Sequence, residues 1–137
     1  MRKIITLLFL CALSLTAFGQ IANESELYGS WKVEKILETY TNPNVQPIIT
    51  GFKNATFTFT ENGNFYIATT ANSELFGMLT EMMDGANWKF EKSKQQVRIG
   101  TEKDGYTTMV IIIREEKGAK LFHLMESELT LKMKKLL

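Results

Sequence analysis

Ala55-Thr56-Phe57-Thr58-Phe59-Thr60 alternates apolar side chains with threonines through six consecutive residues. A period of two is that of a β-strand with one buried and one solvated face, and aromatic and β-branched residues favour strands. The same alternation continues, with interruptions, from Trp31 to the end of the chain. The pattern therefore predicts an all-β protein in which one face of the sheet forms the core.

Short turn sequences divide the rest of the chain. Asn62-Gly63 and Asp104-Gly105 are dipeptides that supply the positive φ angles of tight hairpins, and Lys117-Gly118 separates two further apolar runs. Most connections are too short for a parallel crossover, so successive strands pair antiparallel, and closing the sheet removes its exposed edges. We expect an antiparallel up-and-down barrel of about eight strands, at roughly residues 28–39, 53–61, 64–71, 86–92, 95–102, 106–116, 119–126 and 129–135.

Two segments interrupt the alternation. Residues 41–51 contain both prolines of the chain and are interpreted as a loop across one end of the sheet. The segment near residues 73–84 is predicted to be one short helix that Gly85 ends, because Leu75, Met78, Leu79 and Met82 follow helical spacing.

The first nineteen residues have the pattern of a secretory signal. Arg2 and Lys3 precede an apolar run from Ile4 to Phe18, and Gly19 supplies a small residue before a cleavage point at Gln20. The run is shorter than the roughly 20 residues of a membrane span. We therefore expect a signal peptide over 1–19, one domain over 20–137, no membrane span, and a periplasmic or extracellular location.

Composition excludes several functions for this expected domain. The single cysteine, Cys11, leaves with the signal, and the one histidine, His123, is too few for a zinc site. Two of the 16 Lys and Arg residues lie in the predicted signal, so the expected domain has 14 basic and 15 acidic residues. This near-neutral balance gives no reason to expect nucleic acid as a partner. No common catalytic signature occurs. We expect no enzyme activity, no metal and no cofactor.

A family resemblance rests on the order of several short motifs. Gly29-Ser30-Trp31 resembles the Gly-x-Trp motif that opens the first strand of lipocalins and related calycin barrels. Asn62-Gly63-Asn64-Phe65 and then Gly85-Ala86-Asn87-Trp88 are similar to segments of secreted bacterial lipocalin-like domain proteins, and the likeness covers residues 27–134. The resemblance implies a lipocalin-like barrel that binds a small apolar molecule. It departs from typical lipocalins in the last strand, which offers Lys132, Lys134 and Lys135 where they place an arginine over the motif tryptophan. Arg114, on a different strand, is the nearest substitute by type.

Candidate ligand residues share an apolar or aromatic character and positions on adjoining strands or on the predicted helix. Such a surface suits a pocket for an apolar ligand or an ordinary packed core, and small eight-strand barrels can be filled by their own side chains. Gly29 and Trp31 are interpreted as structural, closing one end of the barrel. The candidates are Phe57, Phe59, Phe65, Ile67, Met78, Met82, Trp88, Phe90 and His123, the last as a hydrogen-bonded core or pocket-rim residue.

Protein interaction is the alternative function. The helix carries more large apolar residues than one buried stripe requires, so it is either a cap on the barrel, a movable lid or a docking surface. Residues 109–113 are apolar on both faces, so we expect the helix or another chain to cover the outer face. The partner in this case is a second copy of the chain or an envelope protein.

Overall fold

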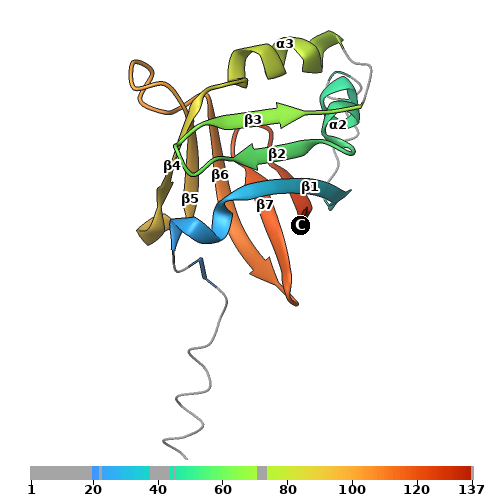
Figure 1. Cartoon of the computed structure of the whole chain (residues 1–137). Helices are drawn as coiled ribbons and strands as arrows, with labels where there is room; N and C mark the ends of the chain where they lie inside the picture. The colour runs from blue at the N-terminus through green and yellow to red at the C-terminus, as the bar shows by residue number, and fades with distance from the viewer. Residues whose placement is uncertain (1–19, 22, 38–43, 45, 71–73, 137) are drawn as a thin grey trace, which may run out of the picture.

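All eight strands form one antiparallel sheet in the computed structural model, which describes residues 20–21, 23–37, 44, 46–70 and 74–136. The predicted signal segment 1–19 lies outside these residues. In the sheet the strands follow the order β3-β2-β1-β8-β7-β6-β5-β4 (Figure 1). Strands that are consecutive in sequence therefore pair with each other except β3 and β4, which are the two outer strands, and β1 pairs with β8. Their bounds are β1 (Gly29–Ile36), β2 (Thr56–Phe59), β3 (Phe65–Ala68), β4 (Asn87–Glu91), β5 (Gln96–Gly100), β6 (Met109–Glu116), β7 (Ala119–Leu124) and β8 (Leu129–Lys135).

The two outer strands of this sheet meet over a short stretch. Asn64 forms an isolated antiparallel bridge with Asn87, and the Phe65 N–H donates to the Ala86 carbonyl at 2.7 Å. The Trp88 N–H donates to the Gly63 carbonyl at 2.9 Å just beyond. The predicted eight-stranded antiparallel barrel is thus confirmed in a nearly closed form, which fits a calycin-like fold.

A second helix corrects the prediction of a loop over residues 41–51, of which residues 41–43 and 45 lie outside the described part of the chain. The structure forms α2 (Gln46–Phe52), in addition to the predicted helix, which is α3 (Glu74–Met83). Pro47 was interpreted as a sign of a loop, but it lies in the first turn of α2. Proline at such a position removes no helical hydrogen bond and presets a helical φ. Ile49 and Phe52 are each 2% exposed and lie on the same, buried side of α2.

Of the four residues whose spacing predicted α3, only Leu79 packs against the core. Phe76 and Met83 are fully buried, whereas Met78 is 61% and Met82 71% exposed. The helix lies beside α2 at one end of the molecule (Figure 1). The Phe76 ring packs edge-on against Phe52 of α2, with ring centroids 4.9 Å apart. Helical spacing alone permitted either stripe, and this aromatic contact with α2 selects the one that includes Phe76.

The connection from β5 to β6 is longer than the predicted tight hairpin at Asp104-Gly105. It runs from Thr101 to Thr108, and the Asp104 carboxylate accepts hydrogen bonds from the N–H groups of Thr101 and Thr107 and from the Thr108 hydroxyl. Partial desolvation raises the pKa of this carboxyl, but hydrogen bonds from Thr108, Thr101, Thr107 and Tyr106 together lower it below its usual value. Asp104 therefore organises the loop as an ionised acceptor.

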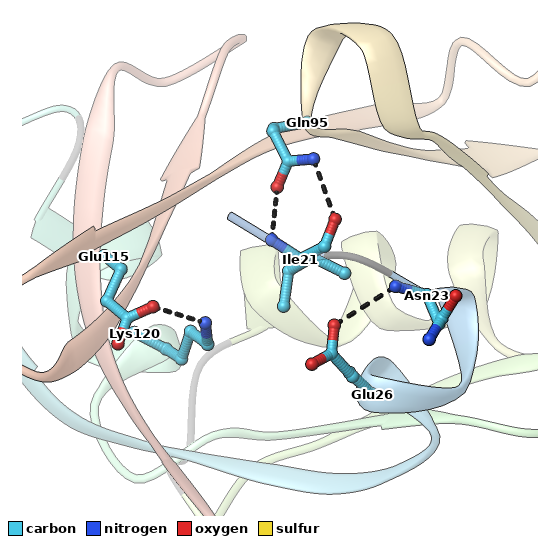
Figure 2. Close-up of polar contacts among 6 residues, drawn as sticks. All are labelled: Ile21, Asn23, Glu26, Gln95, Glu115 and Lys120. Carbon is cyan, nitrogen blue, oxygen red and sulfur yellow. Dashed lines mark hydrogen bonds and ion pairs between the residues drawn. The ribbon is translucent and has the colours of Figure 1, made fainter. Parts of the chain in front are cut away.

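The segment before β1 is fastened across the other end of the barrel. Ile21 is 1% exposed and forms two hydrogen bonds with the side-chain amide of Gln95 (Figure 2). Its N–H donates to Gln95 Oε1 at 2.8 Å, and its carbonyl accepts from Gln95 Nε2 at 3.0 Å. In the same view the Asn23 N–H donates to the Glu26 carboxylate. A single side chain after β4 thus satisfies both main-chain polar groups of one buried residue.

Trp31 is buried and hydrogen-bonded near the start of β1. Its indole N–H donates to the Leu27 carbonyl at 3.0 Å, and its side chain is 4% exposed. Lys135 of β8 lies over the ring, with Nζ 5.4 Å from the centroid, and donates to the Glu26 carbonyl at 3.1 Å. A lysine on the last strand thus covers the tryptophan of the first strand.

Candidate functional site

The centre of the barrel is filled by its own aromatic side chains. Phe59 lies 5.3 Å from Phe65 and 5.2 Å from Trp88, measured between ring centroids, and Phe57 lies 5.8 Å from Phe65. Phe122 of β7 contacts the same group from the opposite wall, 6.1 Å from Phe59. These rings are almost completely buried. Edge-on and tilted aromatic pairs of this kind add stability beyond the area they bury, so the interior is a packed core.

A cavity of about 530 Å³ lies at the end of the barrel beneath α2 and α3. This volume is within the range of small-molecule sites. Eight of its twelve lining residues are apolar, and they come from both helices and from the ends of β6, β7 and β8. The apolar lining consists of Ile48, Ile49, Phe52, Leu79, Met109, Leu124, Met125 and Leu129, and the polar lining of Thr108, Glu126, Ser127 and Glu128.

Close contact between α2 and α3 holds the helical wall of this cavity in place. A Cβ atom on Gly51 would lie 2.0 Å from Cγ of Phe76, so only glycine permits the observed approach. Phe76 in turn packs against Phe52, which lines the cavity together with Leu79 of α3. The position of the wall therefore depends on a small residue in one helix and a large one in the other.

The polar side of the cavity is the turn between β7 and β8. Glu126 accepts a hydrogen bond from the Val110 N–H at 3.0 Å, which ties the turn to β6. Glu128 adopts a positive φ of 57°, and the Ser127 hydroxyl is buried without a hydrogen-bond partner among the described residues. A buried hydroxyl without a partner costs free energy. Glu126, Ser127 and Glu128 of this turn thus form one edge of the apolar cavity.

None of the nine predicted ligand residues lines this cavity. Phe57, Phe59, Phe65, Ile67 and Trp88 belong to the core, and half-buried Phe90 packs against it. Met78 and Met82 are on the exposed side of α3. The cavity residues escaped the sequence prediction because they come from segments far apart in the chain. The hydrophobic spacing of α3 and the apolar run 109–113 drew attention to two of these segments, but not to a cavity between them.

His123 lies on the outer face of the sheet. Its neighbours in β7, Phe122 and Leu124, belong to the interior core, and side chains alternate across a strand. The His123 Nδ1 is 2.9 Å from the Thr130 hydroxyl on β8. Within the described parts of the chain, no three histidine, cysteine, aspartate or glutamate residues form a group that could hold a metal ion.

The outer face of β6 is covered in part by its own sheet. Val110 is 8% exposed although it is separate from the main core, and its register partner on β5 is Arg98, whose Nε is buried. Ile112 is half-buried beside His123. Farther along the strand, Glu115 has the inward parity of Ile111 and Ile113, and it forms an ion pair with Lys120 at 2.9 Å beyond the core (Figure 2). Side chains of the flanking strands thus shield much of the apolar face that the sequence left unexplained.

Comparisons of the chain with protein-family models, curated proteins and solved structures gave no match. In the described ranges, no helix has the length and apolar character needed to cross a membrane. The function is therefore argued from the geometry of the cavity and from the surface around it.

Proposed function

We propose that this protein is an exported, lipocalin-like carrier that binds a small apolar molecule in the cavity beneath α2 and α3. The observation that carries the proposal is the cavity itself, which has a ligand-sized volume and a mainly apolar lining. The aromatic core supports this location, since it occupies the centre of the barrel and leaves the mouth as the place for a guest. The role is binding rather than catalysis.

A neutral fluorescent probe tests whether the cavity takes up apolar molecules. N-phenyl-1-naphthylamine (NPN) is expected to bind with an increase in fluorescence. Met125→Ser removes apolar contact from the lining and is expected to weaken NPN binding about tenfold, which corresponds to roughly 1.4 kcal/mol of lost contact. Met78→Ser is the matched control, because Met78 is a methionine outside the lining. Equal weakening by both variants, or an absence of binding, contradicts the proposal.

Native mass spectrometry tests whether a natural guest is present. The full chain is expressed in a Gram-negative host, the processed protein is isolated from the envelope, and spectra are recorded before and after organic extraction. A reproducible small mass that is lost on extraction supports the carrier function. The N-terminal residue found in the same spectra also tests the proposed cleavage before Gln20 and hence export.

A protein-interaction module is the second candidate function, and exposed side chains on α3 favour it. Leu75 is 45% exposed, and Met78 and Met82 are more exposed still. Contiguous apolar surface of this kind is common at interfaces, and methionine adapts to a partner. The double substitution Met78→Ser with Met82→Ser is expected to abolish co-purification with an envelope protein or dimer formation while leaving NPN binding unchanged. Loss of NPN binding in this variant would instead favour a lid.

A further inference from the structure

Lysines lie opposite lysines on the outer surface of β1 and β8. In the register of these two strands Lys32 is the partner of Lys134, and Lys35 is the partner of Lys132. All four side chains face outward, because the residues beside them in the strands, such as Met133, pack in or against the core. We refer to Lys32, Lys35, Lys132 and Lys134 as the lysine face.

The lysine face does not stabilise the sheet. Like charges directly opposite each other destabilise an antiparallel pair of strands, whereas opposite charges stabilise it. Of these four lysines, only Lys132 forms an ion pair with a carboxylate of the described residues, Glu34 at 4.0 Å. Lysines often protect the unpaired edge of a sheet, but β1 and β8 are interior strands that have β2 and β7 on their other sides. Neither strand pairing nor edge protection therefore accounts for the lysine face.

Further cations adjoin the lysine face. Leu121 of β7 is the register partner of both Lys132 and Arg114, so the row that begins at Lys35 ends on an exposed arginine of β6. A shallow groove continues from Lys132 and Lys134 to the turn between β6 and β7. Its lining includes one carboxylate, Glu34, and the five lysines Lys117, Lys120, Lys132, Lys134 and Lys135.

Charge is distributed unevenly over the molecule. Residues 29–36, 114–120 and 129–135 form the lysine face and its surroundings, and they contain eight of the 14 basic residues of the expected domain but only three of its 15 acidic residues. At the helical end, residues 74–85 carry Glu74, Glu81 and Asp84 and no basic residue. The near-neutral net charge is thus the sum of a basic side and an acidic end.

An extended anionic surface matches this basic side better than a single bound anion. Lysine is a flexible point charge and lacks the planar, bidentate geometry with which arginine recognises one phosphate or carboxylate. The lysine face also spans two strands, and the groove extends it to a hairpin turn. A membrane that contains anionic phospholipids attracts each lysine near its surface without requiring a fixed geometry. The proposed carrier function favours a membrane as the partner, since an apolar guest partitions from water into lipid.

We propose that the lysine face binds the surface of a membrane rich in anionic phospholipids, where the protein exchanges its apolar guest. The need for an anionic partner follows from the lysines, and the choice of a membrane rests on the proposed carrier function. Attraction between surface charges is additive over several lysines and is screened by salt. Binding is therefore reversible, depends on the content of anionic lipid and weakens at high ionic strength.

Co-sedimentation of the processed protein with lipid vesicles tests this assignment. Vesicles of phosphatidylcholine with 40% phosphatidylglycerol are expected to bind the protein at low salt and to release it in about 0.5 M NaCl. Vesicles of phosphatidylcholine alone are expected not to bind it. Equal binding to both kinds of vesicle, or no binding to either, overturns the proposal. Tighter binding to a polyglutamate peptide than to the anionic vesicles would identify an acidic protein as the partner and also overturns it.

Paired substitutions locate the contact. Lys32→Gln combined with Lys134→Gln should weaken vesicle binding about 20-fold, because each lysine near an anionic surface contributes about fivefold. Lys53→Gln combined with Lys103→Gln is the matched control, since it removes the same charge from two exposed lysines outside the lysine face. This control should change vesicle binding about twofold or less. Equal weakening by the two double variants overturns the proposal, because net charge alone would then explain the binding.

A charge reversal separates docking from folding. Lys134→Glu places an opposite charge across from Lys32, so it should raise the urea midpoint of unfolding while weakening vesicle binding at least as much as the double glutamine variant. Binding equal to that of the parent overturns the proposal. NPN binding by the same variants distinguishes the two functions. Loss of vesicle binding with NPN binding intact is expected for the lysine variants, whereas vesicle binding by a parent protein that takes up no NPN contradicts the carrier function and leaves the anionic docking surface in place.

Discussion

Gly51→Ala tests the contact that holds α2 and α3 together. The added methyl carbon would lie 2.0 Å from Cγ and 2.2 Å from Cδ2 of Phe76, far inside the roughly 3.5–4.0 Å at which two carbon atoms attract. The Phe76 ring is fully buried and packs edge-on against Phe52, so it cannot turn without disturbing that contact. The substitution must therefore displace the ring or separate the two helices.

The expected magnitude follows from two opposing effects. Overpacking of a core contact costs about 1–3 kcal/mol, and complete loss of a buried phenylalanine about 3–5 kcal/mol. Alanine within a helix is favoured over glycine by about 0.5–1 kcal/mol. We therefore expect Gly51→Ala to lower the free energy of unfolding by about 2 kcal/mol in the native background. With Phe76→Ala the clash is absent, and Gly51→Ala should then raise it by about 0.5 kcal/mol.

Urea denaturation followed by tryptophan fluorescence measures all four corners of this double-mutant cycle. Gly77→Ala in α3 is the matched control, because nothing lies within 4 Å of the added methyl group, and it should stabilise the protein. The reasoning predicts a coupling of about 2–3 kcal/mol between positions 51 and 76. Equal costs of Gly51→Ala with and without Phe76 would refute it, because the clash could not then be the cause. The same variants should weaken NPN binding if the helix pair forms the cavity wall.

Three further predictions concern other contacts. Lys135→Gln should lower the free energy of unfolding by about 1 kcal/mol in urea, because it removes the cation over Trp31, and Lys135→Arg should restore it. Desolvation raises the Asp104 pKa but loop hydrogen bonds lower it further, so the ionised group stabilises the fold above its unfolded pKa of about 3.9 and this stability is lost as pH falls through the lower folded pKa. Asp104→Asn should therefore lower the urea midpoint at pH 7, with a difference from the parent that shrinks below pH 4. Gln95→Ala should lower the free energy of unfolding by about 1–2 kcal/mol and speed hydrogen exchange at the Ile21 amide, because it removes both hydrogen bonds to Ile21. An unchanged exchange rate would show that these hydrogen bonds do not protect the amide.

The barrel was accessible to sequence analysis because it depends on local signals. Alternation over residues 55–60 identified the inward face of β2, and Phe57 and Phe59 are both fully buried there. Gly63 and Gly118 adopt positive φ in the turns that they were expected to form. Each of these signals concerns residues close in the chain, so no knowledge of distant contacts was needed.

The helical end of the molecule was less accessible. Pro47 occurs both in loops and in the first turn of a helix, and only the burial of Ile49 and Phe52 distinguishes these cases here. The exposure of Met78 also depends on a tertiary contact. Two stripes of α3 are apolar, and the contact between Phe76 and Phe52 determines which stripe is buried.

The sequence by itself determined the strand period, most of the turns, the number of strands and the antiparallel order, because these follow from side-chain alternation and from connection length. Tertiary structure alone decided which apolar residues form a cavity and which form a solid core. The cavity wall combines residues from α2, α3 and the ends of three strands, and the Gly51–Phe76 contact determines how closely the two helices approach. The type of a residue indicates whether its burial is favourable. Whether the buried side chain then packs against another side chain or lines a cavity depends on the packing geometry of distant segments.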